Sequence, residues 1–144
     1  MARTLLDLAN SLERRVAKLD EEASKAAVKV ALTIIGDLVY VTPVDTSQAL
    51  SNWQVSLNSP VDSKIPPYYP GLQGSTQRAS ASAALEAARS VLSGKKPGDK
   101  IYISNVLPYI RRLNDGYSAQ APAGFVERAV LIGRKHAGKL KIKV

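Results

Sequence analysis

The sequence predicts an α+β fold, in which a long N-terminal helix and shorter helices pack on a small, mostly antiparallel sheet. Three observations lead to this prediction: apolar residues recur at helical spacing through residues 4–40, a strand-like alternation follows at 52–57, and a second β-rich run covers 100–104. The chain has 144 residues, 45% of them apolar, so residues 1–144 can bury the core of a single domain. We expect the sheet to pack against the first helix and the last one.

The first predicted helix covers roughly residues 4–40. Thr4 and Asp7 suit a capping pair at its start, and no proline interrupts it before Pro43. Its apolar side chains follow one another at steps of three or four residues: Leu5, Leu8, Leu12, Val16, Leu19, Ala23, Ala26, Val30 and Ile34. The apolar face widens from Val28 onward. We therefore expect the second half to be buried and the first half to face solvent or to dock on a neighbour.

A turn and a strand follow this helix. Pro43 restricts Thr42 and ends the helix, and the Asp45-Thr46 pair suits the hydrogen bonds of a turn. In the strand expected over 52–57, three apolar side chains share one face: Trp53, Val55 and Leu57.

A long loop and an alanine-rich helix form the middle of the chain. Residues 58–74 hold four prolines and two glycines, which predicts a loop that is either ordered or mobile. The run from Ser75 to Leu92 predicts a second helix that ends at Ser93-Gly94.

The last third predicts a strand at 100–104, a short helical turn at 107–113 and a final helix at about 123–136. Residues 137–144 alternate lysines with aliphatic residues. This pattern leaves open an edge strand or a frayed tail.

The formal net charge of +8 is concentrated near the C-terminus. Residues 1–40 carry no net charge, whereas residues 105–144 carry +6. We predict a basic C-terminal tail at 134–144 and a basic surface that comprises Arg128, Arg134, Lys135, Lys139, Lys141 and Lys143. This charge either solvates the terminus or meets an acidic partner or nucleic acid.

Residues suited to catalysis are scarce. The chain has no cysteine and a single histidine, His136, in a basic segment, and it shows no phosphate loop and no dense carboxylate cluster. We predict no enzyme, no catalytic or metal-binding residue and no cofactor. No apolar run is long enough to cross a bilayer, and we expect a soluble intracellular protein without membrane contact.

Aromatic and arginine side chains supply the candidate protein contacts instead: Tyr68, Tyr69, Tyr109, Arg111, Arg112 and Tyr117. Tyrosine and arginine are enriched at binding hot spots. For residues 108–113, a second interpretation stays open, in which the aliphatic residues and Tyr109 pack on the core and the arginines are only solvated.

Two segments, in this order, resemble a known family. The first is Thr42-Pro43-Val44-Asp45-Thr46 followed by Leu50-Ser51-Asn52-Trp53. The second runs through Ile103-Ser104-Asn105, Pro108-Tyr109, Leu113-Asn114-Asp115-Gly116-Tyr117-Ser118 and Ala121-Pro122-Ala123-Gly124-Phe125-Val126. Together they are similar to the neck, tail-completion or head–tail joining proteins of tailed bacteriophages, the group that resembles minor tail protein Z. The resemblance spans about residues 30–130.

The resemblance implies a non-enzymatic virion protein, assembled in the host cytoplasm. It implies a ring, of six or twelve copies, that contacts the head–tail connector and tail proteins and lets DNA pass through its lumen. The chain departs from the family at Ser47, where glycine is frequent, and at Asn114-Asp115, where a glutamate often precedes the glycine.

Two other functions compete with this one. A small basic nucleic-acid-binding protein would use the C-terminal charge, although the chain shows no recognition helix and few aromatic residues for stacking. A small hydrolase or nuclease is disfavoured, because the sequence lacks an acid–base set.

Overall fold

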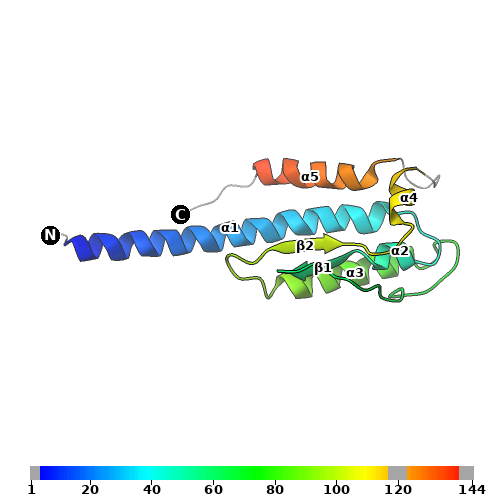
Figure 1. The fold of residues 1–144 in the computed structure, drawn as a ribbon, viewed down its shortest axis with the longest axis horizontal. Coiled ribbons are helices and arrows are strands. Elements are labelled where there is room, and N and C mark those ends of the chain that lie inside the picture. The colour runs from blue at the N-terminus through cyan, green and yellow to red at the C-terminus, as the bar shows by residue number, and fades with distance from the viewer. Residues whose placement is uncertain (1–3, 117–122, 140–144) are drawn as a thin grey trace.

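The computed structural model describes residues 4–116 and 123–139 (Figure 1). Its elements, in chain order, are α1 (Leu5–Val41), α2 (Gln48–Ser51), β1 (Gln54–Leu57), α3 (Gln77–Leu92), β2 (Ile101–Ser104), α4 (Ile110–Asn114) and α5 (Phe125–Lys139). Helices with one small sheet confirm the predicted α+β class.

Helix α1 is the axis of the molecule. Its 37 residues make a rod of about 55 Å. The predicted cap is present, since the Thr4 hydroxyl accepts from the Asp7 amide at 3.1 Å and the Asp7 carboxylate accepts from the Thr4 amide at 3.2 Å. The N-terminal part projects beyond all other elements, and the buried residues lie in the second half, as predicted: Ala31, Ile35, Leu38 and Val39 (Figure 1).

The other elements form layers on two sides of α1. Strands β1 and β2 pair antiparallel, from Gln54 opposite Ser104 to Leu57 opposite Ile101, and α3 packs against β1 and α1. Helix α5 packs against α1 on the side away from the sheet (Figure 1). The prediction that the last helix lies on the sheet is therefore wrong: α3 covers the sheet, and α1 separates it from α5.

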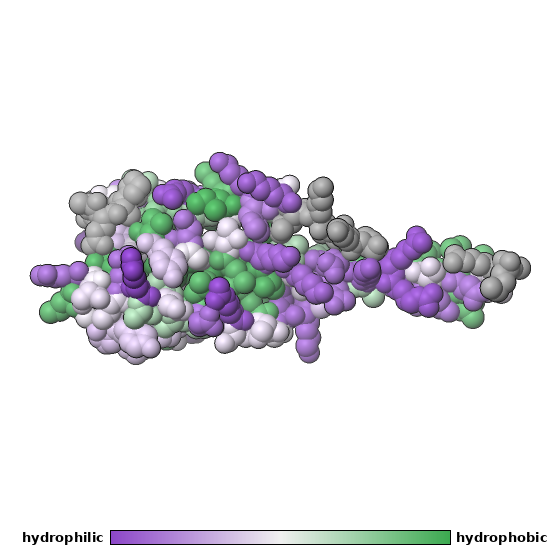
Figure 2. All heavy atoms as spheres, turned by 180° about the vertical axis from the view of Figure 1, so that it is seen from behind, coloured by the Kyte–Doolittle hydropathy of each residue, from purple (hydrophilic) through white to green (hydrophobic). Residues whose placement is uncertain are grey.

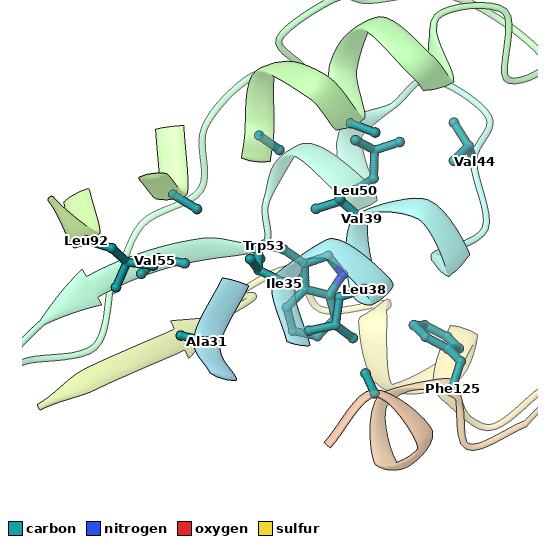
Figure 3. Packing of buried hydrophobic residues seen from close by; sticks show 14 residues of the cluster. Ala31, Ile35, Leu38, Val39, Val44, Leu50, Trp53, Val55, Leu92 and Phe125 are labelled. Carbon is teal, nitrogen blue, oxygen red and sulfur yellow. The ribbon is translucent and has the colours of Figure 1, made fainter. Parts of the chain in front are cut away.

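The core lies where these layers meet, around Trp53, Ile35, Leu50 and Phe125 (Figure 3). Trp53 is buried, as predicted, but it precedes the strand. A short helix, α2, lies between the expected turn and the expected strand, in residues for which we had predicted no element. Because the Trp53 amide donates to the Leu50 carbonyl at the end of this helix, it is not available to the strand ladder.

Helix α5 differs from its predicted range of 123–136, since it begins at Phe125 and continues to Lys139. Residues 137–139 are therefore helical, which contradicts an edge strand or frayed tail for these three; 140–144 lie outside the described residues. The start of α5 is fixed from α4. The side-chain oxygen of Asn114 accepts from the Val126 amide at 2.9 Å, and the backbone carbonyl of Asn114 accepts from the Gly124 amide at 2.7 Å.

Candidate interaction surfaces

The α4 segment fits the capping-turn interpretation of its sequence except at Tyr109, and its role as a protein contact stays a prediction. Ile110 and Leu113 pack against the core, whereas Arg111 and Arg112 are exposed. Tyr109 is 40% exposed, and partial burial raises the pKa of its hydroxyl. The segment is thus a capping turn that also presents one tyrosine and two arginines on the surface.

The loop at 58–74 is ordered by buried polar side chains that lie outside it. Ser80 is fully buried, and its hydroxyl bonds to both the amide and the carbonyl of Tyr69, at 3.0 and 3.1 Å. The Ser51 hydroxyl accepts from the Tyr68 amide at 3.2 Å. These contacts fix the loop backbone while both tyrosine rings remain exposed, at 38% and 54%.

Asn52 holds the same loop further upstream. Its side chain accepts from the Ile65 amide at 2.8 Å and donates to the carbonyls of Ile65 and Gln48 at 2.9 and 2.8 Å. Asn52 is fully buried, so its amide group replaces backbone pairing for a loop without a strand partner. The hold of Asn52 and Ser80 on the loop could not be predicted, since a single polar residue in a strand or helix pattern gives no signal.

The basic surface is present on α5 for the residues that the structure describes. Arg128, Arg134, Lys135 and Lys139 are all exposed. An Arg128 nitrogen lies 3.8 Å from one oxygen of Asp37 on α1, and the other Asp37 oxygen is buried without a hydrogen-bond partner. Lys141, Lys143 and Tyr117 lie outside the described residues.

The first part of α1 carries six exposed large apolar side chains. We call residues 5–19 the bare segment, because every side chain in it is exposed except Ser11, which is half-buried. Its large apolar side chains remain accessible to water, with Leu5 at 86%, Leu12 at 52% and Val16 at 57%. Figure 2 shows hydrophobic residues among the hydrophilic ones on this projecting end.

A groove lies further along the same helix. It has a volume of about 540 Å³ and is lined by Ala26, Ala27, Val30, Ala31, Ile34, Lys95, Asp99, Ile101, Ile103 and Ala137. Its floor comes from α1, its walls come from β2 and α5, and its lining is mostly apolar. We call this feature the α1 groove.

The described residues offer little for chemistry. They contain no group of three histidine, cysteine, aspartate or glutamate residues that could hold a metal ion. Asp45 takes part in turn contacts, since its carboxylate accepts from the Gln73 amide at 2.7 Å and its carbonyl from the Gly74 amide at 2.8 Å. These partners are distant in sequence, whereas we had expected local ones.

Comparison with profiles of known families, with curated proteins and with solved structures found no match. Within the described ranges, no helix combines the length and apolar character needed to span a bilayer.

Proposed function

We propose that this protein is a structural assembly subunit that acts by self-association and docking, not by turnover. The observation that carries the proposal is the bare segment of α1, a projecting helix with six large aliphatic residues exposed to water: Leu5, Leu6, Leu8, Leu12, Val16 and Leu19. An isolated helix of this length is marginal in water, and exposed apolar surface of this kind marks an interaction site.

The particular assembly that we propose is the neck of a tailed bacteriophage, where a ring of six or twelve copies joins the DNA-filled head to the tail. The sequence resemblance supports this choice, and one backbone feature agrees with it. Ser47, where the resembled family often has glycine, adopts a left-handed conformation with φ 68°, which glycine adopts at the least steric cost. On this proposal, Tyr68, Tyr69, Tyr109, Arg111 and Arg112 contact neighbouring copies or the connector and tail proteins.

Light scattering after size exclusion, followed by negative-stain imaging, tests the ring. We expect closed rings of uniform diameter in the purified protein or in neck assemblies that contain it. The ring would be contradicted if both the purified protein and the neck assemblies showed nothing but monomers or irregular aggregates.

A second candidate function is nucleic-acid binding, which the exposed cations of α5 favour. A titration with duplex DNA at two salt concentrations separates the two. A DNA-binding protein loses affinity steeply with salt, in proportion to the number of phosphates that it neutralises. Submicromolar binding at physiological salt would favour this second function.

A further inference from the structure

The apolar stripe of α1 changes in composition along the helix. Leu5, Leu12 and Leu19 are seven residues apart. With Val16 and Ala23, which lie four residues after Leu12 and Leu19, they form one apolar stripe that has the spacing of a helix–helix interface. Within the bare segment the stripe consists largely of leucines. Beyond residue 22 it continues as Ala23, Ala26, Val30 and Ile34, and it enters the α1 groove.

The α1 groove has the shape and chemistry to receive an amphipathic helix. Its floor contains three alanines, whose small side chains leave room for larger ones, and Ile101 and Ile103 provide an aliphatic wall. Peptide helices commonly bind such grooves through apolar anchors spaced three and four residues apart. The bare segment supplies anchors at this spacing in Leu5, Leu8 and Leu12.

The bare segment cannot reach the groove of its own chain. Both lie on one continuous helix, Leu5–Val41, so their separation along the axis is fixed. Only a second copy can therefore bring this segment to this groove.

Charge selects the direction in which a second copy binds. Four charged bands alternate in sign along α1: Asp7 and Glu13; Arg14, Arg15 and Lys18; Asp20, Glu21 and Glu22; Lys25 and Lys29. The first and fourth bands lie at similar distances on either side of residues 18 and 19, and so do the second and third bands. An antiparallel partner centred there places acidic bands at the level of basic ones, with Arg15 and Glu22 flanking the stripe, whereas a parallel partner in register places like charges at the same level.

We propose that two copies pair through antiparallel α1 helices, each placing its bare segment in the α1 groove of the other. Leucines of one copy then lie over the floor of its partner's groove, where Ala26, Ala27 and Ala31 leave room for them beside Val30 and Ile34. The contact is isologous and closes at two copies.

This inference goes beyond the proposed ring and does not depend on it. A two-fold pair presents identical faces, whereas a neck ring has unlike neighbours above and below. The pair is therefore the free form of the protein, and the ring requires it to open.

Cross-linking tests the contact directly, since the natural chain has no cysteine. One preparation carries Leu8→Cys, a second carries Ala137→Cys in the groove wall, and the two are mixed and oxidised. We expect a disulfide-linked pair of unlike chains. The control is Asn10→Cys, which is at the same level of the bare segment but nearly opposite on the helix. Equal cross-linking of Leu8→Cys and Asn10→Cys to the groove would overturn the proposal.

A matched pair of substitutions tests the energetics. Leu12→Asn removes an anchor, whereas Leu6→Asn makes the same chemical change about a third of a turn off the stripe. By light scattering, we expect Leu12→Asn to weaken pairing at least about tenfold, and Leu6→Asn to change it little. Because the bare segment does not pack on its own domain, both variants should keep the melting temperature of the monomer.

The outcomes separate this inference from the proposed function. A two-copy wild type that depends on Leu12 but never forms rings supports the pair and contradicts the ring. Rings without any pairing through Leu12 contradict the pair alone, and a protein that stays monomeric in every condition contradicts both.

Discussion

The indole N–H of Trp53 donates a hydrogen bond to the hydroxyl oxygen of Thr42 at 2.8 Å. The Thr42 hydroxyl donates in turn to the Leu38 carbonyl in the last turn of α1. Trp53 is 8% exposed and Thr42 only 1%. This buried chain of hydrogen bonds ties the end of α1 to the residue that precedes β1, so it fixes the central helix against the sheet.

Truncating Trp53 therefore removes both packing and a hydrogen bond. We expect Trp53→Ala to lower the free energy of unfolding by about 3–5 kcal/mol, measured by urea denaturation. Thr42→Val keeps the shape of the side chain but leaves the indole N–H without its acceptor, and should cost about 1–3 kcal/mol. If Trp53→Ala left stability unchanged, the burial of the indole in solution would be refuted.

A second prediction concerns Gly133, where α5 meets α1. A Cβ atom built at Gly133 would lie within 2.6 Å of the Ile34 Cδ1 atom and closer still to Cγ1. Alanine usually stabilises a helix relative to glycine by about 1 kcal/mol, but overpacking costs about 1–3 kcal/mol. We expect Gly133→Ala to be destabilising by thermal denaturation.

Gly138 provides the matched control within the same helix. A Cβ atom there has no neighbour within 4 Å, so Gly138→Ala should be neutral or stabilising. In the Ile34→Ala background the cost of Gly133→Ala should shrink, because the clashing atoms are gone. Equal effects of the two glycine substitutions in the wild type would show that α5 does not pack on α1 through Gly133.

The third prediction concerns Asn52, whose side chain substitutes for a strand partner of the loop. Asn52→Ala leaves the amide and carbonyl of Ile65 with fewer partners, and should cost about 1–3 kcal/mol. Amide exchange at Ile65 should accelerate. Gln48→Ala should accelerate this exchange less, because Gln48 donates only to the Ile65 carbonyl, at 3.1 Å. Unchanged exchange at Ile65 in Asn52→Ala would argue against this role.

These residues also show where sequence reasoning succeeds and where it stops. Helices α1 and α3 follow from apolar periodicity and alanine content, which are local properties. Helix α2 was missed because four residues, Gln48–Ser51, are too few to show a period. Its geometry depends on the left-handed Ser47 and on bonds from Asn52 to a residue 13 positions away.

The interaction surfaces divide in the same way. The exposed first half of α1 could be predicted, because charged residues surround a narrow apolar stripe before Val28. The α1 groove could not, since Ala26, Ile101 and Ala137 meet only after the layers pack. The end of α5 was placed too early because the alternation after residue 136 resembles a strand.

The fourth prediction is a pH effect at the start of α5. The Asn114 side chain donates to both Glu127 carboxylate oxygens at 3.0 Å, and this hydrogen bonding lowers the pKa of Glu127 below the ordinary glutamate value. The contact therefore contributes to stability above the ordinary pKa, and that contribution is lost as pH falls through the lower, folded-state value.

Carboxyl NMR titration measures this directly. Glu127 should titrate below an ordinary glutamate in the wild type, and Asn114→Ala should return its pKa towards the ordinary value. An unchanged Glu127 titration in Asn114→Ala would assign the shift to another cause.

The last prediction concerns the basic face of α5, and it depends on the proposed neck function. We expect Arg134 and Lys135 to dock on an acidic neighbouring protein and not on the DNA in the channel. A channel through which DNA slides gains nothing from phosphate attraction, because each neutralised phosphate adds salt-sensitive affinity and hence drag. A docking surface gains association rate and register from the same charges. Arg134→Glu combined with Lys135→Glu should therefore leave DNA-filled heads and separate tails, visible by electron microscopy. Joined particles that eject DNA slowly would instead place these residues at the channel, and normal joining with normal ejection would make them solvated charges only.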